Sequence, residues 1–538
     1  MQGNLANRSR KPASRQPYIS PNLLTIEGFE TPFEQLLSKT NRWVQLSKLL
    51  PWDRVVSLYE AQFKSKEGRP PVNGRFVIGA VIIKHMLELT DRETILQIQE
   101  NVFMQYFIGY SSFTNEAPFD ASLFVDIRER LSLPIMNAIS EIVMEHNFQK
   151  PVTDEKLQPH NSEAANPPEH NDQLPPENNT VCCNQSDTGV KNTDAVAASE
   201  NNVTAGAKPK ENKGRLLVDA TVAPQNISYP TDLKVLDAAR VKSEAIIDKL
   251  YRKSIHGDTK PRTYREQARK VFLSTALKKS KTRKEIYKAN AKQLRYLRRN
   301  LGHIDMLLEN NKLAGIEPKM KKKWWNYLQT IRKVYEQQQS MHTTNTHTVE
   351  NRIVNVHQPY VRPIVRGKDG VKVEFGSKIN VAWVNGFSLI DKLSWDNFNE
   401  GKLLKASVEL YKTRFGYYPQ TVLADKIYCN RENRKYLKQL NIELRAKPLG
   451  RPSSDEALSN HVRPGERNPI EGKFGQAKVA YGLQKIRAKL KTTSESWIAS
   501  IMLVLNLVNL TRIASSCLYV IIKLFALQKK TRKIDFLS

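Results

Sequence analysis

The sequence predicts an α/β core that is interrupted by a basic helical insertion and preceded by an all-α N-terminal domain. Three observations support this prediction. Residues 22–150 repeat apolar side chains at helical spacing, residues 151–212 form a polar stretch without Phe, Trp or Tyr, and apolar strand-like runs then alternate with helical segments. Strands and helices that alternate along a chain are typical of a layered α/β domain.

Length and charge limit the classes of protein that the chain can represent. Its 538 residues are enough for two or three domains, each with its own core. The 84 Lys and Arg exceed the 54 Asp and Glu and give a formal charge of +30, so the chain should bind polyanions. Nucleic acid is the first partner to consider, and an anionic membrane surface is the second. The N-terminus lacks the apolar core of a signal peptide, so we expect a cytoplasmic protein.

The cysteines and the apolar C-terminal segment exclude two further classes. A disulfide framework or a zinc finger would need closely spaced cysteines, whereas the chain has only Cys182, Cys183, Cys429 and Cys517. Residues 497–527 are apolar enough to suggest a membrane span. Polar residues interrupt this segment before an uncharged run reaches the roughly 20 residues that a span requires, so we predict buried helices and no membrane partner. The interrupting residues are Asn506, Asn509, Arg512 and Lys523.

The N-terminal domain should consist of short helices. Residues 1–21 are predicted to be a flexible basic segment, and the helical domain should span residues 22–150. Thr90 and Glu93 form a capping-box signal that should start a second helix. Further helices should follow Asp120 and Pro134. The first helix should bury the stripe Phe76, Ala80, Ile83 and Leu87, and the second the stripe Ile95, Ile98, Val102 and Tyr106. Such helices suit either a helix-turn-helix-like DNA-binding domain or a dimerisation bundle.

The stretch over residues 151–212 is predicted to be a disordered linker. It holds many Asn, Pro, Glu and Ser and has ten acidic residues against four Lys. An acidic segment in a basic protein can fold back over a basic surface when DNA is absent. This autoinhibitory role is one possibility for the linker.

The insertion over residues 231–350 should be helical and should contact DNA. It holds 28 Lys and Arg against 12 Asp and Glu, which is about half of the excess charge in less than a quarter of the chain. The clearest candidates for contacts with the DNA backbone are Arg295, Arg298, Arg299, Lys321, Lys322 and Lys323. Trp324 and Trp325 follow these lysines and either stack on a base or belong to the core of the insertion.

The α/β core is split into residues 213–230 and 351–538. Residues 215–224 have the apolar run of a buried strand, and residues 371–395 should form a hairpin or a meander that turns at Asn385 and Gly386. A helix near 402–414, a buried strand ending at Asp425, a helix over 431–440 and a short strand should follow. The last part of the chain, from about Asn468, should be helical.

Three acidic residues stand out by position. Asp219 lies in the first apolar strand and Asp425 at the end of another, where a buried carboxylate is costly unless it is paired or bound to metal. Glu471 can reach both from the helix alongside. Three carboxylates that meet repel one another, and divalent cations relieve this repulsion. Mg²⁺ prefers carboxylate oxygens, and two such ions catalyse phosphoryl transfer. Asp is also a common turn residue, so the acids alone do not decide the matter.

The segments around these acids resemble a known family. VDAT around Asp219, LADKIYCNREN around Asp425 and RNPIEGKFGQAK around Glu471 occur in order. They look like the three catalytic blocks of DDE transposases from bacterial insertion sequences, which have an RNase H-like core with an insertion domain. Arg467, Glu471 and Lys478 match the arginine, glutamate and lysine of that family's YREK signature. The tyrosine of the signature is replaced by Pro464, which removes one expected phosphate contact.

The likeness extends to the segments SYPTDLKVLDAAR and VEFGSKINVAW and to the N-terminal helical region from PPVNGRF to MQYFIG. It implies that Asp219, Asp425 and Glu471 bind two Mg²⁺ ions, for which Mn²⁺ can substitute. It also implies that Arg467 and Lys478 hold DNA phosphates on the same side of the helix as Glu471. Ordinary surface salt bridges are the other interpretation of these two cations. The resemblance further implies cleavage at terminal inverted repeats, strand transfer into target DNA, and a homodimer in the bacterial nucleoid.

Two rival functions remain at this point. A regulator or an inactive transposon relic would keep the fold and the charge without catalysis. A metal-dependent nuclease would cut DNA without joining it. Both a nuclease and a transposase need the same carboxylates, so the sequence does not separate them.

Overall fold

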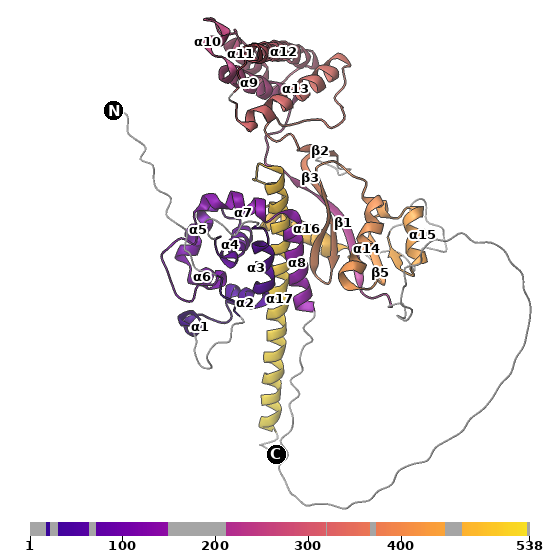
Figure 1. The fold of residues 1–538 in the computed structure, drawn as a ribbon. Helices are drawn as coiled ribbons and strands as arrows, with labels where there is room; N and C mark the ends of the chain where they lie inside the picture. The colour runs from indigo at the N-terminus through magenta and orange to yellow at the C-terminus, as the bar shows by residue number, and fades with distance from the viewer. Residues whose placement is uncertain are drawn as a thin grey trace, which may run out of the picture. The chain divides into compact units, whose positions relative to one another are not determined.

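The computed structural model describes residues 18–21, 31–63, 71–148, 211–318, 320–365, 373–446 and 465–534, and of residues 514–534 it describes the backbone only (Figure 1). Most of the predicted flexible N-terminal segment and nearly all of the predicted linker lie outside these ranges. So does Pro464, and no structural statement about it follows.

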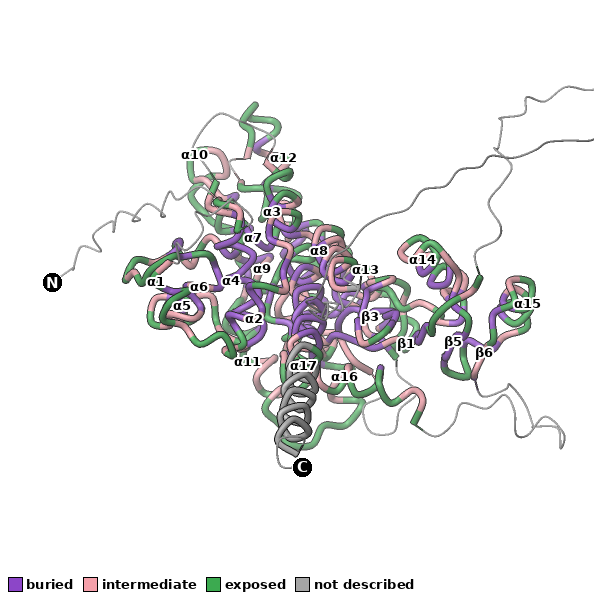
Figure 2. The backbone as a smooth tube through the Cα atoms, turned by 90° about the horizontal axis from the view of Figure 1, so that it is seen from below, coloured by how far each residue is buried: buried purple, intermediate pink, exposed green. Residues whose placement is uncertain are grey.

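The N-terminal part of the described chain is helical. The helix α4 is buried at every position, because α3, α5, α6 and the C-terminal helix α17 (Lys491–Ile534) surround it (Figure 2). The predicted apolar stripe along this helix is therefore part of a segment that is buried on all sides. The helices are α1 (Pro32–Leu36), α2 (Arg42–Leu49), α3 (Trp52–Glu60), α4 (Gly74–Met86), α5 (Asp91–Glu100), α6 (Val102–Ile108), η1 (Ala121–Leu123), α7 (Phe124–Arg130) and α8 (Leu133–Phe148).

The predicted capping box at the start of α5 is confirmed, since Thr90 and Glu93 exchange backbone and side-chain hydrogen bonds. The prediction that one helix continues from Ile95 to Tyr106 is wrong, because the structure has two helices, α5 and α6, over these residues. Asn101 has an extended backbone, and its side chain accepts hydrogen bonds from the amides of Phe103 and Met104. Asn101 thus ends α5 and caps α6, as asparagine commonly does at a helix start.

The core contains a mixed six-stranded sheet with flanking helices, which confirms the coarse α/β prediction. The strands lie in the order β2-β3-β1-β5-β6, and β4 also pairs with β3. β1 is antiparallel to β3 and parallel to β5, and β5 is parallel to β6. The strands are β1 (Arg215–Pro224), β2 (Arg362–Val365), β3 (Val373–Val384), β4 (Phe387–Ser394), β5 (Thr421–Ala424) and β6 (Glu443–Arg445).

The predicted hairpin between β3 and β4 is confirmed. Asn385 and Gly386 both have positive φ angles, 49° and 94°, as a two-residue hairpin turn requires. A Cβ atom at Gly386 would lie 2.4 Å from the side-chain amide nitrogen of Asn509 in α17. Glycine at this turn therefore also permits the close approach of α17.

Helices cover both faces of the sheet. One face packs against α14, η3 and α15, and the other packs against α16 through Ile470 and Phe474 (Figure 1). The bounds of these elements are η2 (Glu400–Leu403), α14 (Leu404–Phe415), η3 (Lys426–Tyr428), α15 (Arg431–Gln439), α16 (Asn468–Ala480) and α17 (Lys491–Ile534).

The apolar C-terminal segment is one long helix, α17. Its part over Lys491–Ile513 is long and apolar enough to cross a membrane by length and composition, but most of it is buried inside the protein, which confirms the predicted burial there. Side chains beyond residue 513 lie outside the described ones. Asn506 accepts a hydrogen bond from the amide of Ser388 at 2.7 Å and donates to its carbonyl at 3.0 Å. The asparagine thus ties α17 to the edge of β4.

The N-terminal helices share one hydrophobic core with α17 and β4 and do not form a separate core of their own. A buried ion pair reinforces this contact. Asp391 on β4 is only 3% exposed, and the Arg414 guanidinium of α14 lies 2.7 Å from it and 2.7 Å from Glu141 of α8. Burial raises the pKa of Asp391, and the nearby Arg414 opposes this effect. Arg414 therefore joins α8, β4 and α14.

The stretch between β1 and β2 is helical and has its own core cluster. Thr231 caps its first helix, and its side chain accepts a hydrogen bond from the amide of Lys234. Asp232, the first residue of that helix, pairs with Arg352 at 2.6 Å. Trp324 and Trp325 are half-buried against this core, which favours the core interpretation over base stacking. The helices are α9 (Asp232–Leu250), α10 (Lys253–His256), α11 (Arg265–Ala276), α12 (Arg283–Leu313) and α13 (Lys322–Thr343).

Candidate active site

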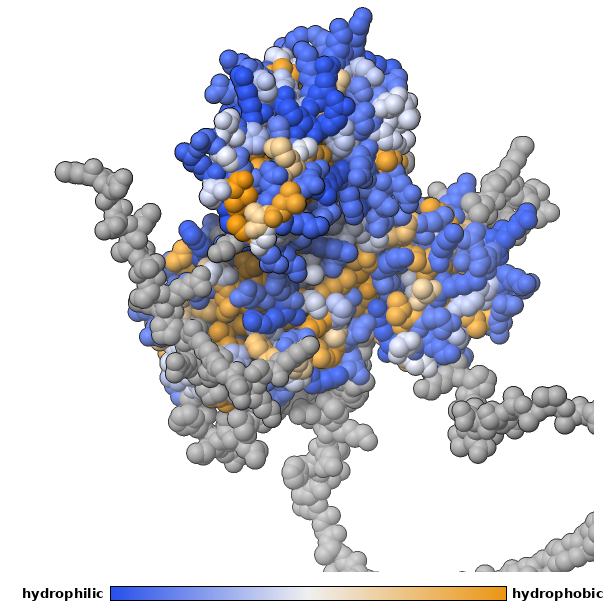
Figure 3. Space-filling view, turned by 45° about the horizontal axis from the view of Figure 1, so that its top comes forward, coloured by the Kyte–Doolittle hydropathy of each residue, from blue (hydrophilic) through white to orange (hydrophobic). Residues whose placement is uncertain are grey.

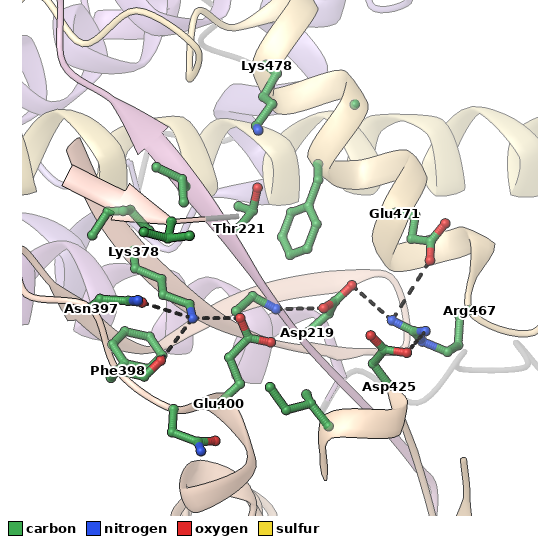
Figure 4. A pocket seen from close by; sticks show the side chains of 18 residues that line it. Asp219, Thr221, Lys378, Asn397, Phe398, Glu400, Asp425, Arg467, Glu471 and Lys478 are labelled. Carbon is green, nitrogen blue, oxygen red and sulfur yellow. Dashed lines mark hydrogen bonds and ion pairs between the residues drawn. The ribbon is translucent and has the colours of Figure 1, made fainter. Parts of the chain in front are cut away.

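A cavity lies along the free edge of β1 in the core. β5 pairs with β1 only as far as Val218, which lies opposite Ala424. No described strand continues the pairing on that side, so β1 from Asp219 to Val222 lines a cavity of about 1010 Å³. The other walls come from β2, the turn before η2, the start of η3, and α16 (Figure 4). The end of β5 therefore creates the opening.

Asp219 is the most buried acid of this cavity, with a side chain that is 16% exposed. Its Oδ1 accepts a hydrogen bond from the amide of Ala220 at 2.8 Å. Burial raises the pKa of Asp219 to about 6, although the Arg467 guanidinium lowers it and the charge of Glu400 raises it further. The Asp219 carboxylate is thus mostly buried, as predicted from the sequence, and burial disfavours its charged form.

Asp425 follows the last residue of β5 and caps η3. Its Oδ1 accepts a hydrogen bond from the amide of Lys426 at 2.8 Å. The turn after it is anchored by Tyr428, which is fully buried and donates a hydrogen bond to Asn380 on β3 at 2.9 Å. Parallel pairing of β5 with β1 and this anchor bring Asp425 to the same cavity as Asp219.

Glu471 lies in the first turn of α16, and Arg467 is the residue at the start of that helix. The Arg467 guanidinium lies 3.1 Å from a carboxylate oxygen of Asp219, 3.1 Å from one of Asp425 and 3.8 Å from one of Glu471. Lys478, two turns further along α16, also lines the cavity. Figure 4 shows the arginine among the three acids. The residues of the three sequence motifs therefore meet at one place.

The arrangement changes the expectation for Arg467. The resemblance implied a contact with DNA phosphate, whereas here its guanidinium pairs with the three carboxylates. Within the described ranges, no three Asp, Glu, His or Cys side chains form a group that could hold a metal ion. The positive charge of Arg467 offsets the repulsion that would otherwise separate the acids. Carboxylate oxygens are nevertheless the type of donor that a hard divalent cation such as Mg²⁺ prefers.

Two further charged residues of the cavity were not predicted from the sequence. Lys378 on β3 lies 2.7 Å from Glu400 and also donates to the carbonyl of Phe398 at 2.9 Å. Glu400 thereby lines the cavity as a fourth carboxylate. A lysine inside the apolar run of β3 was a signal for such a partner. The glutamate sits in a turn, and its local sequence gave no such signal.

The basic residues predicted in the insertion do not line this cavity. Lys321, Lys322 and Lys323 are exposed, as are Arg295 and Arg298. Arg299 is half-buried, and its guanidinium lies over the ring of Tyr264 at 4.2 Å from the centroid. Arg299 is therefore partly engaged within the protein, whereas the others face solvent.

One side of α12 carries three exposed lysines in addition to the predicted arginines. Lys284, Lys288, Lys292 and Arg295 are exposed and follow the spacing of a single helix face. We call these residues the basic face of α12. The insertion also presents a largely hydrophilic surface in the view of Figure 3. A straight row of cations of this kind suits a polyanion.

The raised pKa of Asp219 predicts a pH-dependent stability. Because the folded pKa is about 6 and the ordinary value is 3.8, the folded state binds more protons between these values, and stability falls as pH rises through this window. Asp219→Asn should therefore raise the free energy of unfolding by up to about 3 kcal/mol at pH 7.5, and by less as pH falls toward 4.

Urea unfolding in EDTA at several pH values measures this effect. Asp396→Asn is the control, because that carboxylate is 71% exposed and does not line the cavity. An Asp219→Asn protein less stable than wild type at pH 7.5 would contradict the prediction.

Comparison with known proteins adds family information. A model described as a transposase DDE domain matches residues 422–508, and one described as a transposase domain (DUF772) matches residues 31–130. An uncharacterized protein, ORF8 in the nfe locus of Rhizobium meliloti, is 30% identical over 103 residues, which is 19% of this chain and 49% of that protein. The match thus spans about half the length of this relative. No solved structure matches the chain significantly.

The segment that matches the DDE domain contains two of the three acids of the candidate active site. Asp425 and Glu471, which share the guanidinium of Arg467, both lie within the segment that matches the DDE domain. Helices α1 to α7 lie within the segment that matches the second transposase model. Asp219 precedes the DDE match, and its place beside the other two acids rests on the structure. The two family-model matches, over residues 31–130 and 422–508, together support a DDE transposase of the insertion-sequence type.

Proposed function

We propose that the chain is a DNA transposase that cleaves the ends of its mobile element and joins them to target DNA. The observation that carries the proposal is the meeting of Asp219, Asp425 and Glu471 around one guanidinium. The three acids come from β1, the end of β5 and α16, and the first two are more than 200 residues apart in the sequence. One guanidinium neutralises only one of these three negative charges, and the two that remain favour a site for divalent cations.

The order and directions of the strands support an RNase H-like assignment for the core. Three antiparallel strands, β4, β3 and β1, continue into the parallel strands β5 and β6. The core of DDE transposases is of this type by the resemblance drawn above. The helical segment between β1 and β2 then corresponds to the insertion domain. We place its bounds at about residues 231 and 350.

The residues of the cavity suit metal-dependent phosphoryl transfer. Asp219, Asp425 and Glu471 would hold two Mg²⁺ or Mn²⁺ ions, which supply activation of the attacking oxygen and stabilisation of the leaving oxygen. Lys378 keeps Glu400 oriented toward the same cavity. Arg467 and Lys478 place two cations along its wall, where they can bind phosphate oxygens of DNA.

The partners proposed are double-stranded DNA with the terminal inverted repeats, and target DNA. A homodimer that pairs the two ends, in the cytoplasm of a bacterium and associated with its nucleoid, follows from the resemblance. The N-terminal region over residues 22–150 is proposed to bind DNA or to support this dimer. The charge of the chain, +30, supports the DNA partner.

The test is incubation of the purified protein with labelled DNA that carries the element's own terminal repeats, together with a plasmid target and Mg²⁺. A joined product that requires metal supports the transposase. Cleaved ends without any joined product would instead indicate a nuclease. Binding without cleavage would indicate a regulator or an inactive relic.

The basic face of α12 should carry part of the DNA affinity. Replacing Lys288, Lys292 and Arg295 together with Gln should lower the slope of log affinity against log salt by roughly 2 to 3, since each phosphate contact contributes about 0.9. Fluorescence anisotropy with a duplex in EDTA measures the slope. The matched control replaces Arg434, Lys435 and Lys438, which are exposed on α15. Equal slopes in both triple variants would refute a special role for α12.

A further inference from the structure

A second cavity, of about 360 Å³, lies where α4, α5 and α7 meet the start of α17 and the segment before it. Lys84, Asp91, Arg128, Arg487, Lys489 and Trp497 are among its lining residues, and it shares no residue with the active-site cavity. Both transposase-matching regions contribute to it, since α4, α5 and α7 lie in one and Arg487 to Trp497 lie in the other.

The inner wall of this cavity has two cations and one carboxylate. Lys84, whose side chain is 2% exposed, lies 2.9 Å from an oxygen of Asp91, and Arg128 lies 2.9 Å from the same oxygen. Both cations also lie over the indole of Trp497, at 4.9 and 5.7 Å from its centroid. Asp91 neutralises only one of the two charges. A positive charge thus remains in a largely buried setting, where it is costly without an anion.

The rim adds more positive charge. Residues 485–489 run as an irregular segment in which Ile486 and Ala488 are buried while Lys485, Arg487 and Lys489 are exposed. Arg487 lies 3.7 Å from Glu88, the second carboxylate nearby, which belongs to the adjoining cavity. The pKa of Lys84 is lowered by burial and by the charges of Arg128 and Arg487, despite Asp91. The lysines and arginines of the inner wall and the rim therefore outnumber the two carboxylates, Asp91 and Glu88.

We propose that this cavity binds a phosphate group of the DNA backbone. The inference rests on the proposed function, because it takes DNA as the partner of the chain. Lys84 and Arg128 supply two cations in the inner wall, where they contact Asp91 and the indole of Trp497. Arg487 and Lys489 add exposed cations to the lining of the same cavity. A phosphodiester is an anion that a row of Arg and Lys recognises without regard to base sequence. The contact would fix DNA against the joint between the N-terminal helices and the core.

The test is DNA binding by an Arg487→Gln/Lys489→Gln variant, measured by anisotropy in EDTA so that catalysis plays no part. These side chains are exposed, so the fold should persist. We expect about 10-fold weaker binding at 100 mM salt and a salt slope lower by roughly 1 to 2. The control is Arg434→Gln/Lys435→Gln on α15, which should bind like the wild type. Wild-type affinity in the test variant overturns the site.

A second variant is expected to change DNA affinity in the opposite direction. Asp91→Asn removes the only carboxylate of the inner wall, keeps a hydrogen-bond acceptor, and should tighten DNA binding about threefold or more if a phosphate enters the cavity. Weaker or unchanged binding by a folded Asp91→Asn protein would overturn the proposal. A third measurement tests small phosphates: inorganic phosphate or a mononucleotide at millimolar concentration is added, and the thermal stability of the wild type and of Arg487→Gln/Lys489→Gln is compared. If the additive stabilises only the wild type while both proteins bind DNA equally well, the ligand is a small phosphate. The DNA assignment is then overturned.

The same experiments separate this inference from the proposed function. A wild type that binds no DNA at all removes the premise of both. A wild type that binds DNA but cleaves none leaves this test intact, because its readout is affinity. Unchanged affinity in the variants, with cleavage in the wild type, refutes only the second site.

Discussion

Asp425→Asn is expected to lose cleavage and joining of transposon ends by at least about 10³-fold, because an amide is a poor ligand for the divalent cations on which the reaction would depend. The fold should be retained, since the side chain is 53% exposed and the amide oxygen can still accept the hydrogen bond from Lys426. DNA affinity should stay at the wild-type level or rise, because a negative charge is removed from the cavity.

The rate of product formation on labelled terminal-repeat DNA measures this loss. Glu432→Gln is the matched control, because this glutamate pairs with Lys405 at 2.6 Å on the neighbouring helix and does not line the cavity. It should keep wild-type activity. Cleavage that survives in Asp425→Asn would mean that the reaction takes place elsewhere.

Arg414→Met should have the largest effect on stability, with a loss of about 3 to 5 kcal/mol. The substitution keeps most of the volume but leaves Asp391, which is 3% exposed, as an unpaired buried carboxylate. It also removes the contact to Glu141 on α8. The N-terminal helices and the core would lose their shared ion pair at the same time.

The double variant Arg414→Met/Asp391→Leu should recover most of this loss, because no buried charge remains. Urea midpoints of wild type, both single variants and the double variant form the necessary cycle. An Arg414→Met protein within about 1 kcal/mol of the wild type would show that water or rearrangement compensates the carboxylate.

Local sequence signals were sufficient for much of the core. The apolar runs predicted β1 and β5, and the turn residues Asn385 and Gly386 predicted the hairpin, because each depends on interactions within a few residues. The same holds for the start of α5 at Thr90. The apolar strands also placed Asp219 and Asp425 in or at the ends of strands of one sheet. The local sequence pattern alone therefore predicted that these two acids lie close together.

Local sequence patterns could not predict the features that depend on contacts between residues far apart in the chain. Arg467 pairs with Asp219 across 248 residues of sequence, so its role as the internal counter-charge could not be read from its own helix. Lys378 and Glu400 meet only when β3 and the turn before α14 fold together. The shared core of α17 with α4 and α8 likewise results from tertiary packing, which no helical periodicity specifies.

The three carboxylates are proposed to act on DNA phosphate through divalent cations. A direct measurement places sulfur at a non-bridging oxygen of the scissile phosphate in terminal-repeat DNA and compares cleavage rates in Mg²⁺ and Mn²⁺. We expect that one sulfur diastereomer is cleaved much more slowly in Mg²⁺ and that Mn²⁺ restores its rate, because Mn²⁺ accepts sulfur ligands more readily. Cleavage in EDTA, or equal rates for all substrates in both metals, would contradict this proposal.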